Sequence, residues 1–314
     1  MLNAQTPPVI EGRVINGTSN RPVAKAEVSY VLMAQGMSPA ATQVTDAEGK
    51  FRFDKLPAAN SPALLRVEYQ GATYSRPVMP QQATGPTDIQ VFDAARDRGL
   101  VSVKEHAIFL HPTGSTLLVM EQIILANQSK KTYVDPSGTF LFTIPGKPQR
   151  PPQIAVEGPG GMPINQSPID KSENRYAVAY PIRPGETQIR AEYALDYQAP
   201  FLFAKTFDIQ PESAHIVTPG NNKVQVVGDG LTPVGADPST GFTGYQVALK
   251  GNQVRLEVSG DVPMKVPGGD SQGEEAEPAS LIPIPDPVSS RRWIVLSAAG
   301  LVMLAGLVYH LRHG

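Results

Sequence analysis

The chain of 314 residues contains no cysteine, which excludes disulfide bonds, a cysteine nucleophile and thiolate metal sites. Tryptophan occurs once and aromatic residues make up 7% of the chain, so few rings are available to stack on a ligand. An excess of basic charge is also missing, with 27 Lys and Arg against 29 Asp and Glu. A broad basic surface for nucleic acid is therefore excluded.

Helical periodicity is scarce except near the C-terminus, and turn residues are abundant instead. The chain has 31 prolines and 28 glycines, which separate short segments of alternating apolar and polar residues. Such alternation is typical of half-buried β-strands. We therefore expect an all-β fold of tandem β-sandwich domains, followed by a Pro-rich stalk and one C-terminal transmembrane helix.

Residues 8–92 are expected to form the first sandwich. Turn sequences at Asn16-Gly17, Asp46–Gly49 and Gln70-Gly71 separate its alternating segments. The expected strands are residues 9–15, 26–32, 50–53, 64–69 and 87–92.

The motifs of this region resemble those of the carboxypeptidase regulatory-like domain. They are Gly12-Arg-Val14, Arg21-Pro-Val-Ala-Lys-Ala-Glu-Val28, Thr45-Asp-Ala-Glu-Gly-Lys-Phe-Arg-Phe53, Leu56-Pro57 and Val67-Glu-Tyr-Gln-Gly71. The resemblance implies a seven-stranded, transthyretin-like sandwich, a fold also grouped with starch-binding-like folds. It implies little about activity, because the family occurs as an accessory module in many extracytoplasmic proteins.

Residues 99–262 continue the alternating pattern, resemble no family, and are expected to form a second β-sandwich region. Whether residues 215–262 are a separate small unit stays open. The expected strands are residues 100–103, 116–125, 139–144, 176–180, 188–195, 201–209, 223–227, 245–249 and 254–258.

The C-terminal part of the sequence predicts attachment to a membrane. Residues 263–290 form a linker rich in Pro, Gly and acidic residues, and residues 293–309 contain no charged side chain. With two more residues this span would be about 28 Å long as a helix, close to the thickness of a bilayer core. The predicted transmembrane helix covers residues 291–311, and residues 312–314 form a short tail. Its interfacial anchors are Trp293, Tyr309, Arg291, Arg292 and Arg312.

The orientation in the membrane rests on two conflicting signals. The arginines around the span weakly favour a cytoplasmic N-terminal side. Residues 1–7, expected to be disordered, include Leu2-Asn3-Ala4, which resembles the end of a secretory signal peptide. A leading signal translocates large domains regardless of nearby charge, so we expect the domains outside the cytoplasm, in the periplasm or at the cell surface.

Residue patterns for catalysis, cofactors or metals are not found. Metallocarboxypeptidases use an H-x-x-E zinc motif, but no histidine here has a glutamate three residues later. His106 and His111 lie an odd number of residues apart, so a continuous strand would point them to opposite faces. We expect them at the surface or at strand ends. The sequence thus predicts no enzyme activity, no cofactor and no metal site.

One cluster of aromatic residues allows two interpretations. Tyr193, Tyr197, Phe201 and Phe203 lie close together in the sequence and could form an exposed platform for sugar rings. A β-sandwich also needs such rings for its core, and core packing is the favoured alternative.

The sequence therefore predicts a non-enzymatic, membrane-anchored protein of the cell envelope that presents β-sandwich modules for protein interaction or scaffolding. Its expected partners are the bilayer, through residues 293–311, and an envelope protein. The alternative is a carbohydrate-binding envelope protein that uses the starch-binding-like fold to hold a polysaccharide. Nucleic acid is not an expected partner.

Overall fold

The computed structural model describes residues 9–33, 38–54, 63–79, 85–220, 223–237 and 241–262. These residues form β-strands, loops and a short 3-10 helix, η3 (Arg98–Leu100), and contain no α-helix. The predicted all-β class is thus confirmed for the described part of the chain. No helix in this part is long and apolar enough to cross a membrane. The predicted linker at 263–290 and transmembrane helix at 291–311 lie outside the described residues.

The chain divides into two compact units. Of the described residues, unit 1 contains those within 9–104, 124–142 and 154–189, and unit 2 contains those within 105–123, 143–153 and 190–262. Three long strands contribute residues to both units: β10 (Val101–Thr113), β11 (Thr116–Asn127) and β18 (Gly185–Asp196). The region predicted as 99–262 is therefore distributed over both units, and residues 215–262 lie in unit 2 together with residues 190–214.

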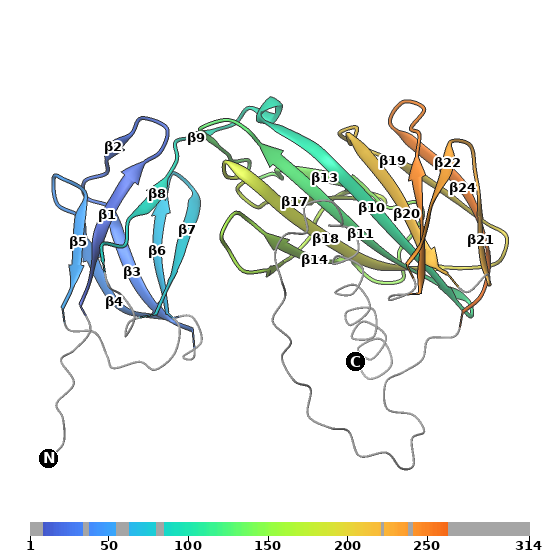
Figure 1. Cartoon of the computed structure of the whole chain (residues 1–314), viewed down its shortest axis with the longest axis horizontal. Helices are drawn as coiled ribbons and strands as arrows, with labels where there is room; N and C mark the ends of the chain where they lie inside the picture. Colours follow the sequence, from blue (N-terminus) through green and yellow to red (C-terminus); the bar gives the residue numbers. More distant parts are fainter. Residues whose placement is uncertain are drawn as a thin grey trace, which may run out of the picture. The chain divides into compact units, whose positions relative to one another are not determined.

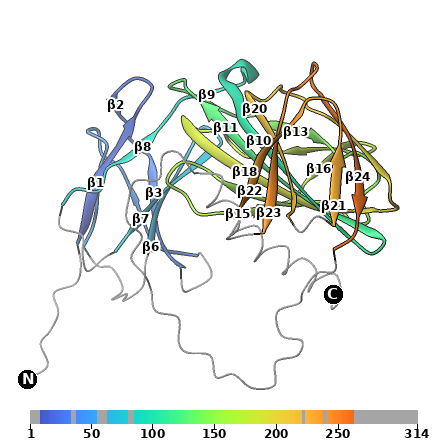
Figure 2. The same cartoon turned by 45° about the vertical axis from the view of Figure 1, so that its right-hand side comes forward.

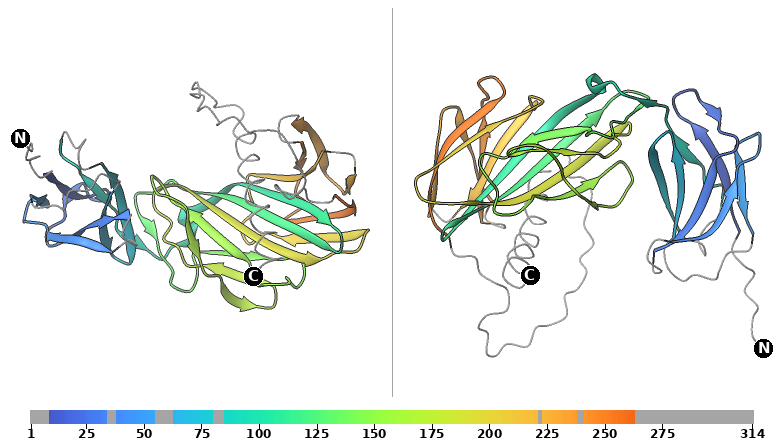
Figure 3. Two further views of the ribbon diagram at one scale, coloured as in Figure 1. Left: turned by 90° about the horizontal axis from the view of Figure 1, so that it is seen from below. Right: turned by 180° about the vertical axis from the view of Figure 1, so that it is seen from behind.

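The first sandwich, at the N-terminal end of unit 1, consists of two sheets (Figure 1). One has the order β4-β3-β6-β7, and the other has the order β2-β1-β5 with β8 paired parallel to β1. The strands are β1 (Ile10–Asn16), β2 (Arg21–Pro22), β3 (Glu27–Leu32), β4 (Pro39–Val44), β5 (Lys50–Phe53), β6 (Ala63–Tyr69), β7 (Ala72–Val78) and β8 (Ile89–Val91). Figure 3 (right) shows both layers from behind.

Alternation in these strands places one set of side chains in a common core. Val14, Tyr30 and Leu65 are fully buried and come from both sheets, and Phe53 contacts Tyr30 with ring centroids 6.1 Å apart. The five predicted strands are present. Three further strands lie outside the five expected ranges: β2 has only two residues, β4 is exposed along nearly its whole length, and the end of β7 contains Arg76-Pro77. None of the three alternates over the full length that marks a half-buried strand.

The predicted turn at Asp46–Gly49 connects β4 in one sheet to β5 in the other, and the predicted turn at Gln70-Gly71 closes the hairpin of β6 and β7. Asp46 Oδ1 accepts hydrogen bonds from the backbone N–H groups of Glu48 and Lys50 at 3.0 and 2.7 Å. Gly49 follows with φ of +72°, a conformation that favours glycine. Gln70 and Gly71 both have positive φ, as a two-residue turn between β6 and β7 requires.

Unit 1 continues with shorter strands. β9 (Ala94–Ala95) pairs in parallel with β12 (Thr132–Tyr133), and Tyr74 Oη lies 2.7 Å from Thr132 Oγ1. β14 (Gln153–Glu157) pairs with β15 (Ile164–Gln166). A three-stranded sheet has the order β13-β17-β16, with β13 (Phe140–Thr143), β16 (Ile169–Ser172) and β17 (Arg175–Val178).

Unit 2 contains strands of two sheets, seen from a second angle in Figure 2. In one, β10 pairs in parallel with β20 (Ser213–Pro219), which pairs with β23 (Phe242–Val247), and β23 pairs with β22 (Leu231–Asp237). The other has the order β19-β24-β21, with β19 (Phe201–Thr206), β24 (Gln253–Gly260) and β21 (Val224–Val227). Ile108, Ile216, Phe203 and Leu256 are among its buried apolar side chains.

Candidate functional site

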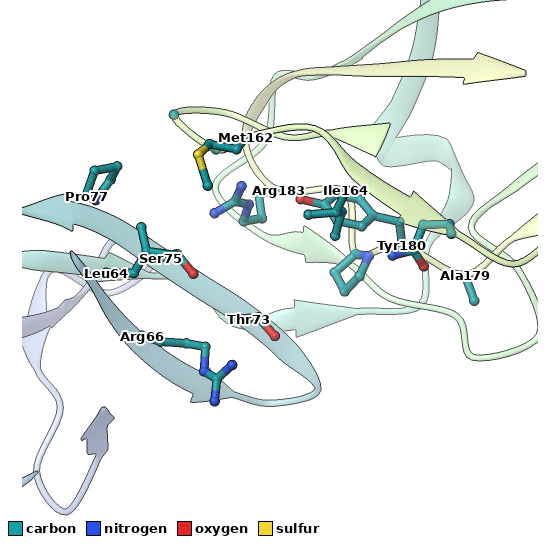
Figure 4. Close-up of a pocket in the computed structure, with 14 residues that line it drawn as sticks. Leu64, Arg66, Thr73, Ser75, Pro77, Met162, Ile164, Ala179, Tyr180 and Arg183 are labelled. Carbon is teal, nitrogen blue, oxygen red and sulfur yellow. The ribbon is translucent and has the colours of Figure 1, made fainter. Parts of the chain in front are cut away.

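A cavity of about 340 Å³ lies in unit 1 between strand surfaces and loops (Figure 4). One wall comes from β6 and β7, and the other comes from the loop before β15, from β15 itself and from residues 179–183. The lining residues are Leu64, Arg66, Thr73, Ser75, Pro77, Gly160, Gly161, Met162, Ile164, Gln166, Ala179, Tyr180, Pro181 and Arg183.

The register of β6 and β7 places their lining residues on one face. Leu64 pairs with Pro77 and Arg66 pairs with Ser75, so these side chains share the outer face of the sheet. Leu65, between Leu64 and Arg66, is fully buried in the core of the sandwich. The period-two pattern that builds the core therefore also directs Arg66 toward the cavity.

Arg183 is the most unusual side chain of this cavity. It is only 9% exposed, and its Nη2 donates to the backbone oxygen of Pro159 at 3.2 Å. The guanidinium carbon lies 5.9 Å from the centroid of the Tyr74 ring. Its Nε is buried and has no hydrogen-bond partner among the described residues. Buried cations normally have a carboxylate partner, so Arg183 is under-compensated.

The charge around the cavity has one sign. Arg66 and Arg183 are the only charged residues among the described residues that line it. Neither forms an ion pair with a carboxylate in the described part of the chain. Glu68 lies two residues from Arg66 on the same strand, but its Oε1 accepts a hydrogen bond from Thr73 Oγ1 at 2.7 Å. The cavity therefore offers two guanidinium groups to an anionic ligand.

A second hollow, of about 530 Å³, lies on the first sandwich and has a different charge pattern. Its lining charges are mostly paired: Arg13 Nη2 lies 3.3 Å from Asp88 Oδ2, and Arg52 Nη1 lies 2.7 Å from Glu11 Oε2. All four side chains are substantially exposed to solvent. This hollow therefore has no net preference for a charged ligand.

Unit 2 contains a buried charge centre, which we define as Glu121, Lys205, His106 and Tyr193. Glu121 Oε1 accepts from Lys205 Nζ at 2.7 Å and from Tyr193 Oη at 2.5 Å. Glu121 Oε2 lies 2.6 Å from His106 Nε2. Lys205 Nζ also donates to the backbone oxygen of Thr143 at 2.7 Å. All four side chains are almost completely shielded from solvent.

Burial and pairing together fix the protonation of this centre. Burial alone would raise the pKa of Glu121, but the charge of Lys205 and the hydrogen bonds from His106 and Lys205 lower it from 4.5 to about 2. Burial lowers the pKa of His106, although the carboxylate of Glu121 opposes this. His106 is therefore neutral at pH 7 and donates its Nε2–H to the carboxylate. Burial and the nearby negative charge raise the pKa of Tyr193 well above its ordinary value.

The first sandwich places its sequence motifs at positions that only certain residues can occupy. A Cβ atom on Gly12 would lie 2.0 Å from the backbone oxygen of Thr87, so the close approach of the two segments requires glycine. Thr45 is buried, and its Oγ1 donates to the backbone oxygen of Val23 at 2.7 Å and accepts from the N–H of Ala26 at 2.9 Å. Phe51 and Phe53 both belong to the core.

Residues 9–91 match the family model of the carboxypeptidase regulatory-like domain. This confirms the resemblance inferred from the sequence, with nearly the same boundaries. A comparison of the chain with curated proteins finds no match. The motifs that carry the regulatory-like match are turn and core residues, whereas the arginine that this domain contributes to the cavity, Arg66, lies outside all of them.

The predicted aromatic platform is largely inside the protein. Tyr193, Tyr197 and Phe203 are buried, and Phe201 is half-buried. Tyr193 donates to Glu121, and Tyr197 Oη donates to the backbone oxygen of Gly260 at 2.7 Å. Burial of these rings counts against a sugar-stacking surface, because such a surface must be open to solvent. It agrees with the core packing that the sequence also allowed.

The prediction for His106 was wrong. It lies inside β10 and is 2% exposed, because Glu121 satisfies its Nε2 and the ring of Phe207 packs at a centroid distance of 4.9 Å. His111 is half-buried within the same strand, with Nε2 3.2 Å from the backbone oxygen of Val262. In the described part of the chain, no three His, Asp or Glu side chains are grouped to hold a metal ion. The predicted anchors at 291–312 lie outside the described residues.

Proposed function

We propose that this protein is a single-pass membrane protein of the cell envelope whose β-domains bind a protein partner without catalysing a reaction. The regulatory-like domain supports a role as a β-sandwich interaction module. The cavity in unit 1 carries the proposal, because it combines two arginines lacking carboxylate partners with exposed apolar walls. The uncharged segment 293–309, flanked by arginines, supports membrane attachment.

In this proposal the protein acts by holding its β-domains close to the membrane, where they meet their partner. The Pro-rich linker of residues 263–290 would span at most about 90 Å when extended, which allows the domains to stand clear of the bilayer. Attachment confines the domains to a thin layer above the membrane, and this raises the effective concentration of any partner in that layer. The carbohydrate-binding alternative loses the aromatic platform, because those rings are mostly buried, and it then rests on the starch-binding-like fold of the first domain alone.

Site-specific photo-crosslinking in living cells tests the binding function. A photoreactive amino acid replaces Met162 at the cavity or, as a matched control, Leu202 in unit 2; both are exposed apolar residues. We expect one discrete crosslinked product from position 162 that is absent from position 202. Deleting residues 291–314 should release the chain from the membrane fraction and weaken the product. Identical crosslinking from both positions would contradict a binding role for the cavity.

Protease protection in intact cells tests the orientation. The chain carries one epitope before Pro8 and a second after Gly314. Digestion of the domains from outside, with survival of the tail epitope, is the expected result. Protected domains with an accessible tail would mean that the chain faces the cytoplasm, and the envelope function would then be abandoned.

A further inference from the structure

We propose that the cavity in unit 1 binds an acidic segment of a protein partner, in which two carboxylates flank an apolar side chain. This inference rests on the proposed function, since it names the chemistry of the partner that the β-domains would bind.

The two arginines give the cavity positive charge that no carboxylate of the described residues compensates. Arg183 is nine-tenths buried, donates one hydrogen bond to a neutral carbonyl, and keeps a buried Nε without a partner in the described part of the chain. Arg66 is half-buried on the opposite wall and also has no ion pair there. Guanidinium groups bind carboxylates with charge-assisted hydrogen bonds, which are stronger where water is partly excluded. A carboxylate ligand would supply the partner that the fold itself does not.

The two arginines belong to different walls of the cavity. Figure 4 shows Arg183 beside Met162 on one wall and Arg66 on the β6 wall. A ligand that contacts both arginines therefore extends from one wall of the cavity to the other. A ligand that satisfies both arginines needs two anionic groups with a spacer between them, and two acidic residues of a peptide provide this.

The walls between the arginines carry apolar side chains. Met162 and Ile164 are 44% and 45% exposed, although side chains of this kind are usually buried. Leu64, Pro77 and Pro181 extend the apolar lining. Methionine adapts its shape to a partner, so this wall suits an apolar side chain placed between the two acids.

The size and polar groups of the cavity favour a peptide over a sugar. A volume of about 340 Å³ is near the lower end for ligand pockets and holds a few side chains. Among the lining residues that the structure describes, Tyr180 is the only aromatic residue, Gln166 carries the only side-chain amide, and none has a carboxylate. A neutral sugar would need ring surfaces for stacking and several such polar groups for its hydroxyls.

Fluorescence anisotropy with the full chain in detergent tests the inference. The probe is the fluorescein-labelled peptide Ser-Gly-Glu-Val-Glu-Gly-Ser, compared with the analogue that has Gln in place of both Glu. We expect the acidic probe to bind at least about tenfold more tightly, a difference of about 1.4 kcal/mol. Its affinity should fall as salt is raised, because ions screen the attraction between the acidic probe and Arg66, which is half-buried.

Two variants assign the binding to the cavity. R66Q removes a cavity cation and should weaken the acidic probe about tenfold, whereas R21Q removes an exposed cation from β2 of the same domain and should change its affinity less than about twofold. M162S, at an exposed position, should weaken both peptides and provides a second test of the apolar wall. Thermal unfolding of each variant verifies that the domain is folded.

Three results would overturn the inference: no saturable binding of the acidic probe up to about 1 mM, equal losses in R66Q and R21Q, or tighter binding of an oligogalacturonate that R66Q abolishes. The last result would assign the cavity to acidic sugars. Failure of the proposed function is distinguishable, because a chain that does not fractionate with membranes can still bind the peptide. Conversely, a specific crosslink from position 162 without peptide binding would contradict only the acidic-segment assignment.

Discussion

Unit 1 and unit 2 each hold charged side chains away from bulk water, but they compensate the charge in opposite ways. In unit 2, Glu121 accepts hydrogen bonds from Lys205, His106 and Tyr193, so the negative charge is surrounded by donors. In unit 1, Arg183 is nearly as buried, yet its described neighbours are one carbonyl and one ring. The comparison separates charge that stabilises a fold from charge that remains available to a ligand.

The physical basis of the difference is the cost of removing one partner. A buried ion pair gains little over a well-packed apolar core, but loss of one member leaves an uncompensated charge in a medium of low dielectric constant. Arg183 has no ion-pair partner among the described residues, so its removal leaves no opposite charge buried without compensation. The two regions should therefore respond very differently to single substitutions, and the following predictions run from the largest expected effect to the smallest.

Lys205→Met should have the largest effect. It leaves the carboxylate of Glu121 buried without its cation, and we expect the free energy of unfolding of unit 2 to fall by about 3–5 kcal/mol. Adding Glu121→Gln to this variant should restore part of the loss, because the stranded charge is removed. Urea unfolding followed by circular dichroism measures both variants. If Lys205→Met lowers the free energy of unfolding by less than about 1 kcal/mol, Lys205 does not compensate the buried charge of Glu121 as described.

Acid should destabilise unit 2 in two steps. The pKa of His106 is lowered from 6.5 in the fold, so the unfolded chain binds a proton more readily and stability is lost as the pH falls below 6.5. The pKa of Glu121 is lowered from 4.5 to about 2, so its contribution is present above pH 4.5 and is lost as the pH falls from 4.5 toward 2.

His106→Gln isolates the first step. The variant should lose about 1 kcal/mol less stability than the wild type between pH 7 and 5.5, as measured by urea unfolding at each pH. His111→Gln should also reduce the pH dependence, because burial lowers the pKa of His111 as well; since His111 lies away from Glu121, at Val262, the two reductions should add in the double variant. Parallel pH profiles for His106→Gln and the wild type would contradict a neutral His106.

Arg183→Met should change the stability of unit 1 by no more than about 1 kcal/mol. The substitution loses a contact with the Tyr74 ring and one hydrogen bond, but it also removes the desolvation cost of a buried cation without an ion pair. Thermal unfolding compared with Lys205→Met gives the contrast directly. A loss as large as that of Lys205→Met would show that Arg183 is compensated by the fold after all.

Arg66→Gln should have the smallest effect on stability, within about 0.5 kcal/mol, because Arg66 is half-buried and makes no ion pair among the described residues. Its effect should appear in ligand binding instead. A clearly lower unfolding temperature for this variant would mean that Arg66 stabilises the fold. Arg66 would then not be a charge that remains available to a ligand, which would contradict the contrast drawn between the units.

Sequence alternation predicted the strands of the first sandwich well, because one face of each predicted strand enters a core. β4 was missed because it is exposed and shows little alternation. β20 was missed although its buried and half-buried positions alternate, because the half-buried positions include Ser213 and His215. The turns at Asp46–Gly49 and Gln70-Gly71 were predictable because their backbone conformations favour particular residues.

The charged sites were not predictable in the same way. Lys205 stands at an inward position between Phe203 and Phe207, and Glu121 interrupts an apolar run, so local pattern marks each as unusual. That they meet depends on the packing of β19 against β11, which no local signal encodes. The cavity has the same origin, since Arg66 and Arg183 are far apart in the sequence and only the fold of unit 1 brings their walls together.

Hydrogen–deuterium exchange of the full chain, with and without the acidic peptide, tests the central claim that the cavity rather than the buried charge centre binds a partner. We expect the peptide to slow exchange in residues 73–77 and 160–166 and to leave residues 105–123 and 201–206 unchanged. Slower exchange confined to residues 105–123 and 201–206, or no change anywhere at saturating peptide, would contradict it.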